Sequence, residues 1–126
     1  MSQTILVVED SPTVVKFLAF SLKSQGYKVV AACDGMDALE KMSGLPNEPD
    51  LIITDLNMPN LDGYALIETV RQSHRRMPII ILTSEGDEAD RERGMAVGAD
   101  SYLVKPFKPA VLLCEVSKYL SGKRND

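Results

Sequence analysis

The sequence has no apolar run long enough to cross a membrane and no segment typical of a secretory signal peptide. Its first apolar run covers only residues 5–8 and ends in two acidic residues, whereas a membrane helix needs about 18 or more apolar residues. Low-complexity segments and a linker to a second domain are also missing. At 126 residues, 44% hydrophobic and 25% charged, the chain has the composition of one globular domain. We expect a single cytoplasmic domain over residues 1–126, with a core at about residues 3–121 and a frayed tail at 122–126.

Paired metal-binding cysteines and a basic surface are absent as well. The two cysteines, Cys33 and Cys114, lie far apart and form no C-x-x-C pair. Because both have apolar neighbours, we predict that they are buried free thiols. The formal net charge of −4 argues against a nucleic-acid-binding face. One basic cluster lies at the carboxyl end of the helix that we predict from about Gly63. We interpret it as a solvated helix cap, since cations are favoured at the carboxyl end of a helix. Its members are Arg71, His74, Arg75 and Arg76.

Short apolar runs alternate with segments whose apolar residues repeat at helical spacing. The runs predict strands at residues 5–8, 27–32, 51–55, 79–82 and 101–104. Helices are expected between and after them. Four start near Pro12, Gly63, Glu88 and Pro109. Asp34-Gly35 breaks the second strand, and the helix after it is marked by Ala38, Leu39 and Met42. Five such units predict an α/β fold, with a five-stranded parallel sheet in the flavodoxin-like order 2-1-3-4-5 and helices on both faces. The fourth helix, about residues 88–97, is highly charged and should pack lightly.

Chemically active side chains stand where four of these strands end. Glu9 and Asp10 follow the first strand, Asp55 ends the third, Thr83 ends the fourth and Lys105 ends the fifth. In the order 2-1-3-4-5 these strands are successive neighbours about 4.8 Å apart, so the residues share roughly 15 Å of one sheet edge. Open α/β sheets bind their ligands at this edge. Lys105 lies two strands from Asp55, and its long side chain can lean across the gap.

These residue types together favour phosphoryl chemistry. Three carboxylates repel one another unless a cation joins them. Without His or Cys at the edge, zinc is disfavoured, and oxygen ligands favour Mg²⁺. Lys105 and Thr83 add a cation and a hydroxyl for phosphoryl oxygens, and the central Asp55 can serve as a nucleophile that forms an aspartyl phosphate. Each residue alone also has an ordinary interpretation: Asp55 and Thr83 as helix caps, Lys105 as a surface lysine. Their joint position at one edge favours the site.

Four segments carry a resemblance to a known family. They are Val8-Glu9-Asp10-Ser11, the run D-L-N-M-P-N-L-D-G at residues 55–63, Thr83-Ser84, and the run G-A-D-S-Y-L-V-K-P-F at residues 98–107. In this order, the chain resembles the receiver domain of two-component response regulators over essentially its whole length.

The resemblance implies a phosphoacceptor and a metal site. Asp55 would accept a phosphoryl group from a histidine kinase or a phosphotransfer protein. Glu9, Asp10, Asp55 and the backbone carbonyl of Asn57 would organise Mg²⁺. Lys105 would pair with the phosphoryl group, and its peptide bond to the following proline would be cis.

It also implies a switch. The Thr83 hydroxyl would move toward the phosphoryl group and the Tyr102 ring would turn inward, altering the face formed by the fourth helix, fifth strand and fifth helix. Tyr102 can alternatively be an edge aromatic packed on the fourth helix. Ser84 is small and keeps the acceptor reachable. Asn57 and Glu85 flank the entry of water and should tune dephosphorylation.

Our hypothesis is a stand-alone receiver that is not an enzyme beyond its own phosphorylation and dephosphorylation. It would be a monomer or weak dimer, with a phosphorelay or adaptor role toward an unknown output protein and no nucleic-acid or membrane partner. The charged segment at residues 88–93 departs from what we expect of a motor-binding chemotaxis regulator. Two alternatives stay open. One is a phosphohydrolase with Asp55 as transient nucleophile, although such dehalogenase-like enzymes usually carry a second acid where this chain has Asn57. The other is a pseudo-receiver adaptor, which typically lacks the Asp or Lys present here.

Overall fold

Strands and helices alternate strictly along the chain. The computed structural model describes residues 2–121, so the tail predicted to fray at residues 122–126 lies outside the described residues. The elements are β1 (Thr4–Val8), α1 (Pro12–Lys23), β2 (Lys28–Ala32), α2 (Gly35–Gly44), β3 (Leu51–Asp55), α3 (Gly63–Ser73), β4 (Ile79–Ser84), α4 (Glu88–Val97), β5 (Ser101–Lys105) and α5 (Pro109–Leu120). Within residues 2–121, no helix combines the length and the apolar character needed to span a membrane.

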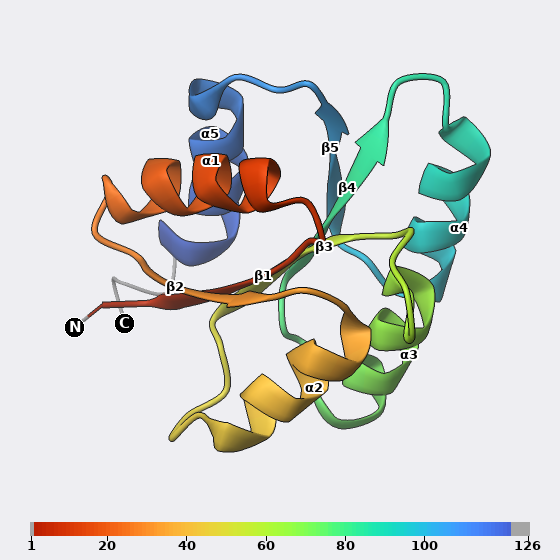
Figure 1. The fold of residues 1–126 in the computed structure, drawn as a ribbon, viewed down its shortest axis with the longest axis horizontal. Coiled ribbons are helices and arrows are strands. Elements are labelled where there is room, and N and C mark those ends of the chain that lie inside the picture. The colour runs from red at the N-terminus through yellow and green to blue at the C-terminus, as the bar shows by residue number, and fades with distance from the viewer. Residues whose placement is uncertain (1, 122–126) are drawn as a thin grey trace.

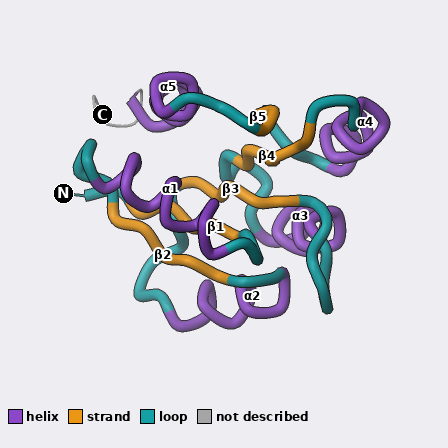
Figure 2. Tube along the Cα trace, turned by 45° about the horizontal axis from the view of Figure 1, so that its top comes forward, coloured by secondary structure: helices purple, strands orange, loops and turns teal. Residues whose placement is uncertain are grey.

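The five strands form one parallel sheet in the order β2-β1-β3-β4-β5, which confirms the predicted topology. Helices α1 and α5 cover one face, and α2, α3 and α4 cover the other (Figures 1 and 2). Because the strands are parallel, their carboxyl ends all point to the same edge. The sheet therefore brings Val8, Asp55, Ser84 and Lys105, each the last residue of its strand, to one side of the molecule.

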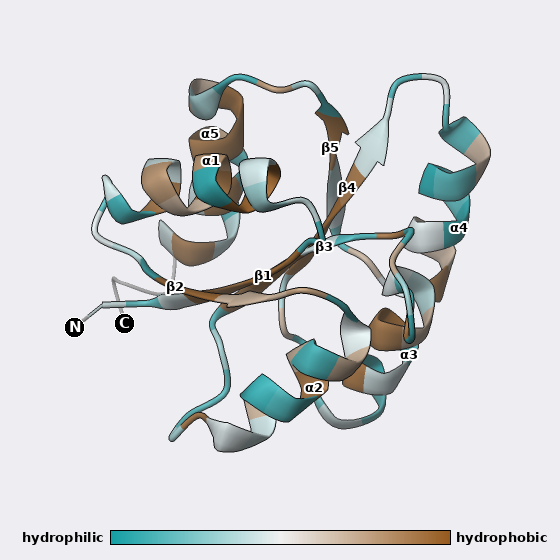
Figure 3. Cartoon of the chain, viewed as in Figure 1, coloured by the Kyte–Doolittle hydropathy of each residue, from teal (hydrophilic) through white to brown (hydrophobic). Residues whose placement is uncertain are grey.

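Each face of the sheet has its own apolar core, because alternate strand residues point to opposite faces. Leu6 and Ile52 pack toward α2 and α3, whereas Ile5 and Ile53 pack toward α1 and α5. The inner strands are hydrophobic over most of their length, and β4 becomes polar toward its carboxyl end (Figure 3). This explains why they read as apolar runs in the sequence.

Side-chain caps fix where three of the helices begin. Ser11 accepts a hydrogen bond from the Val14 N–H at 3.4 Å, with Pro12 as the first helical residue. Asp34 and Asp62 cap α2 and α3 in the same way. In α4, by contrast, the N-cap residue makes no side-chain hydrogen bond and Gly94 is the buried residue. This agrees with the light packing predicted for residues 88–97.

The prediction of buried cysteines was wrong, since Cys33 and Cys114 are both exposed. Cys33 follows β2, which is an edge strand with a neighbour on one side only. Cys114 lies two residues after the buried Leu112 in α5. At 3.6 residues per turn, that places it about 200° around the helix from Leu112, on the solvent side.

The interpretation of the basic cluster as a solvated cap holds for only part of it. Arg75 and Arg76 are exposed, as expected of a solvated cap. Arg71 instead donates hydrogen bonds to the Gly98 carbonyl oxygen at 2.9 Å and to the Asp100 carboxylate at 2.8 Å. It thereby ties the end of α3 to the turn that precedes β5.

Candidate functional site

Three carboxylates meet at the carboxyl ends of β1 and β3. One carboxylate oxygen from each of Glu9, Asp10 and Asp55 lies within 4.8 Å of the others. They meet because β1 and β3 are neighbours in register, with Val8 opposite Thr54. Glu9 is buried, Asp55 is half-buried and Asp10 is exposed, so the cluster opens to solvent on the Asp10 side.

Among the described residues, the Lys105 ammonium group is the one positive charge that contacts this cluster. Its ammonium group donates a hydrogen bond to Glu9 Oε1 at 2.9 Å and lies 3.7 Å from Asp55 Oδ2. The lysine ends β5 and leans across β4, as the strand order predicted, although its closest partner is Glu9 rather than Asp55. The Lys105–Pro106 peptide bond is cis, as the resemblance implied.

The charges at this edge shift two pKa values. Burial raises the pKa of Glu9 above its ordinary value, and the negative charge of Asp55 adds to this, while the hydrogen bonds from Lys105 and from the Ser11 N–H lower it by less. Burial alone would lower the pKa of Lys105, but the hydrogen bond to Glu9 and the charge of Asp55 raise it overall. The lysine is therefore held in its charged form, and the cluster carries an excess of negative charge that favours a cation.

The helix-cap interpretation does not account for Asp55 or Thr83. Asp62 caps α3, and α4 begins beyond its N-cap residue Asp87. Asp55 uses Oδ1 to accept the N–H of the next residue at 2.8 Å, while Oδ2 is the oxygen nearest Lys105. Thr83 is 5% exposed, and its hydroxyl donates only one long hydrogen bond, of 3.5 Å, to the Leu103 carbonyl oxygen.

The remaining predicted residues surround this group on the solvent side. Asn57 is exposed and lies two residues after the end of β3. Ser84, the last residue of β4, and Glu85, which follows it, are also exposed. Thr83, Ser84 and Glu85 also line a cavity of about 190 Å³, together with Val104 and α4 residues.

Tyr102 does not point into the site. The residue is 40% exposed, and the Arg91 guanidinium lies over its ring, 4.7 Å from the ring centre. A second stack of this kind places Arg93 of α4 over Tyr64 of α3, at 3.9 Å. The alternative of an edge aromatic packed on the fourth helix thus describes the contact that Tyr102 makes here, and the contact is with an arginine.

Sequence reasoning missed a hydrogen-bonded polar pair, in which Asp34 is buried and Asn60 is exposed. Asp34 is 6% exposed and accepts a hydrogen bond from the Asn60 side-chain amide at 2.6 Å. Asp34-Gly35 was read only as a strand break. Asn60 has a left-handed backbone with φ of 66°, a conformation that Asn adopts more readily than most residues. That preference marks a turn but gives no sign of the partner.

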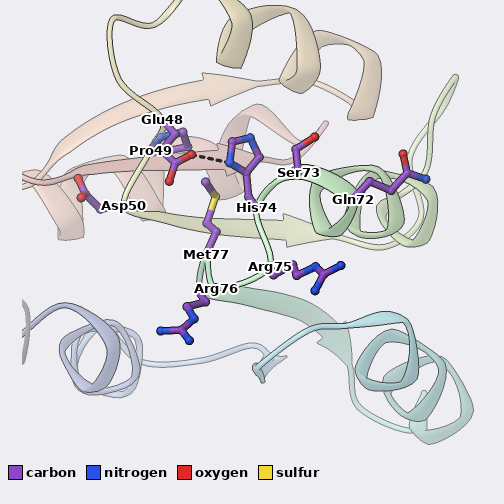
Figure 4. A pocket seen from close by; sticks show the side chains of 9 residues that line it. All are labelled: Glu48, Pro49, Asp50, Gln72, Ser73, His74, Arg75, Arg76 and Met77. Carbon is purple, nitrogen blue, oxygen red and sulfur yellow. Dashed lines mark ion pairs between the residues drawn. The ribbon is translucent and has the colours of Figure 1, made fainter.

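A further cavity lies at the opposite edge of the sheet, where β3 and β4 begin. It has a volume of about 440 Å³ and is lined by residues 48–50 and 72–77. Figure 4 shows His74 and Glu48 facing each other across it as an ion pair. The acidic cluster at the carboxyl edge is therefore separate from this cavity.

Comparison with known proteins identifies the family. The response regulator receiver domain model matches residues 5–117. The chain is 38% identical, over 120 residues, to the alkaline phosphatase synthesis transcriptional regulatory protein PhoP of Bacillus subtilis (strain 168), a match that covers 95% of this chain and 49% of PhoP. It thus spans about half the length of the curated relatives it matches.

Two solved structures show the same fold at similar identity. The chemotaxis response regulator CheY4 of Vibrio cholerae has a TM-score of 0.87 and 35% identity, covering 95% of this chain and 100% of that one. The receiver domain of the sensor histidine kinase PA1611 from Pseudomonas aeruginosa PAO1 has a TM-score of 0.86 and 35% identity, covering 96% and 99%; it was solved with a magnesium ion coordinated in its active-site cleft. With its parallel sheet, its acidic cluster and these matches, the chain belongs to the response regulator receiver domain family of two-component signalling.

Proposed function

We propose that this chain receives a phosphoryl group on Asp55 from a histidine kinase or a phosphotransfer protein and signals through the α4–β5–α5 face. The observation that carries the proposal is the cluster of Glu9, Asp10 and Asp55 with the Lys105 ammonium group 3.7 Å from Asp55. The phosphohydrolase alternative gains no support from this geometry, since the residue two positions after Asp55 is Asn57.

The residues present fit a magnesium ion. Glu9, Asp10 and Asp55 offer only oxygen, the type of ligand that Mg²⁺ prefers, and the backbone carbonyl of Asn57 would complete the protein's share. Both Glu9 oxygens already accept protein hydrogen bonds, but each carboxylate oxygen has a second lone pair for a further partner. A bound Mg²⁺ would neutralise charge on the phosphoryl oxygens.

In the transfer step, a side-chain oxygen of Asp55 forms a bond to phosphorus. The phosphorus–nitrogen bond of the donor phosphohistidine breaks, and the imidazole nitrogen leaves with the electron pair. Asp55 Oδ1 is held by the N–H of Leu56, which leaves Oδ2, beside Lys105, as the attacking oxygen. Lys105 then pairs with the phosphoryl oxygens, and the Thr83 hydroxyl exchanges its long hydrogen bond to Leu103 for a stronger one to the phosphoryl group.

The proposed conformational switch couples a movement of the Thr83 hydroxyl to a rotation of the Tyr102 ring. When its hydroxyl moves toward the phosphoryl group, the cavity of about 190 Å³ beside Thr83 and Val104 becomes open to the ring of Tyr102. Inward rotation of Tyr102 separates it from Arg91 and changes the surface of α4 and β5. The small Ser84 keeps the acceptor open to its donor.

Dephosphorylation depends on water that reaches the phosphoryl group past the exposed Asn57 and Glu85. We propose that these two side chains set the lifetime of the phosphorylated form.

We also propose that the receiver covers residues 1–126 and works on its own, as a phosphorelay carrier or as an adaptor for another protein.

Intact-mass measurement tests the proposal. The full chain, Asp55→Asn and the exposed control Asp87→Asn are incubated with acetyl phosphate, with and without Mg²⁺. We expect one added phosphoryl group in the parent and in Asp87→Asn, and none in Asp55→Asn or without Mg²⁺. Absence of added mass from acetyl phosphate and from a panel of phosphorylated kinases, in folded protein that binds Mg²⁺, would favour the pseudo-receiver. Multiple turnover of small phosphate esters would favour the phosphohydrolase.

A further inference from the structure

The loop that follows the acceptor is held at two places. This loop covers residues 56–62 and connects β3 to α3. Its base is closed by the Gly63 N–H, which donates to the Leu56 carbonyl oxygen at 2.9 Å. The approach is tight, because a Cβ on Gly63 would lie 2.3 Å from the Asp55 carbonyl oxygen. The base of the loop is therefore fixed directly against the strand that carries the acceptor.

The tip of the loop is held by two residues from a different part of the chain. The Asn60 amide donates to Asp34 Oδ2 at 2.6 Å, and the Gly35 N–H donates to the Leu61 carbonyl oxygen at 2.9 Å. Gly35 allows this approach, because a Cβ there would lie 2.4 Å from that oxygen. Asp34 Oδ1 accepts the Asp37 N–H at 2.8 Å. Both Asp34 oxygens are thus engaged, one with the start of α2 and one with the loop.

We propose that Asp34 is a positioning residue for the metal site: through Asn60 it fixes the loop so that the backbone carbonyl of Asn57 faces the carboxylates. Asn57 is exposed and lies three residues before Asn60, so its carbonyl direction depends on how the loop is held. The inference rests on the proposed magnesium site. Residues that orient a metal ligand typically contribute 10- to 100-fold in metal affinity.

Two variants remove the hydrogen bond from opposite sides and keep the local backbone. Asp34→Ser retains a good N-cap for α2, but its hydroxyl is too short to reach Asn60. Asn60→Gly keeps a residue that accepts a positive φ and changes no charge. Asp37→Asn is the matched control for charge. Asp37 lies in the first turn of α2, the helix that Asp34 caps, and its side chain contacts Cys33 and Lys41 rather than the loop.

The readout is the Mg²⁺ dissociation constant of the full chain, measured by NMR titration with magnesium chloride. We expect about tenfold weaker binding in Asp34→Ser and Asn60→Gly, and less than about a twofold change in Asp37→Asn. At saturating Mg²⁺, the rate of phosphorylation by acetyl phosphate should return to within about twofold of the parent. Unchanged Mg²⁺ affinity in either folded variant would overturn the positioning role, as would a weakening in Asp37→Asn equal to that in Asp34→Ser. If the parent binds Mg²⁺ but takes up no phosphoryl group, the proposed function fails, while the comparison of affinities still decides the role of Asp34.

Discussion

Replacing Lys105 by methionine should change metal binding and phosphorylation in opposite directions. The substitution keeps most of the apolar stem and removes the ammonium group that lies 2.9 Å from Glu9 and 3.7 Å from Asp55. The cluster then holds three carboxylates without a cation. A magnesium ion experiences less repulsion and binds more tightly, whereas a phosphoryl group, itself negative, loses its partner.

The size of the effect follows from the geometry. Two unit charges about 4 Å apart interact by about 4 kcal/mol at an effective dielectric constant of about 20. The Lys105 side chain is 27% exposed, so water and salt reduce this, and we expect Mg²⁺ to bind about tenfold more tightly, or about 1.4 kcal/mol. Removing one preorganised electrostatic partner of a transition state slows reactions by about 100-fold or more, and we expect that loss in the rate of phosphorylation at saturating Mg²⁺.

Metal titration by NMR and phosphorylation followed by intact mass would measure both quantities on the same samples. Lys108→Met is the matched control, because Lys108 is exposed at the start of α5 and should leave both quantities unchanged. Weaker Mg²⁺ binding in Lys105→Met, or an undiminished rate of phosphorylation, would refute the electrostatic role assigned to this lysine.

Three further substitutions test other parts of the site. Because burial raises the pKa of Glu9 above its ordinary value, the metal-free protein gains stability as pH falls through that raised pKa; Glu9→Gln should be more stable than the parent at pH 7, and denaturation in chelator should show this difference vanish once the pH lies below the ordinary pKa of glutamate, whereas a constant difference would contradict it. Arg91→Ala removes a contact of about 0.5–1 kcal/mol that holds Tyr102 in its outward position. Because Tyr102 then turns inward more easily, phosphorylation by acetyl phosphate should become about two- to fivefold faster. An equal effect of Arg93→Ala would show that Tyr102 is not the cause. Gly63→Ala places a methyl group against the backbone of β3 and should lower the free energy of unfolding by about 2 kcal/mol and weaken Mg²⁺ binding; unchanged denaturation and Mg²⁺ titrations would show that this approach is not tight.

The fold could be predicted because the decisive signals are local. The runs around Ile5, Ile53 and Ile80 are apolar on consecutive residues, as in strands covered on both faces, and proline or a capping residue begins most of the helices. Once the strand order is given, the positions of Asp55 and Lys105 at one edge follow without further information. The prediction that the two cysteines are buried was wrong because apolar neighbours in the sequence do not show which side of a helix or strand a residue occupies.

What could not be predicted is which distant side chains meet. Arg71 was read from its place at a helix end, but its partners are Gly98 and Asp100, whose positions depend on how α3 packs beside α4. Asp34 and Asn60 are separated in the same way. Each of these residues has a common local role, and no spacing in the sequence distinguishes a cap or turn residue from one that also holds a second loop.

The contacts that hold α4 offer the proposed phosphoryl group on Asp55 a route to the surface. The helix buries Gly94, where a Cβ would lie 2.6 Å from the end of the Ile81 side chain, so it lies close to the sheet with little apolar area of its own. Its sides are held by Arg93 over Tyr64 and by Arg91 over Tyr102. Tyr64 is 4% exposed, whereas Tyr102 is 40% exposed and belongs to the edge strand. We therefore expect a displacement of α4 to begin at Tyr102, with the contact at Tyr64 retained, so that a change at the acceptor reaches the surface through the weaker of the two stacks.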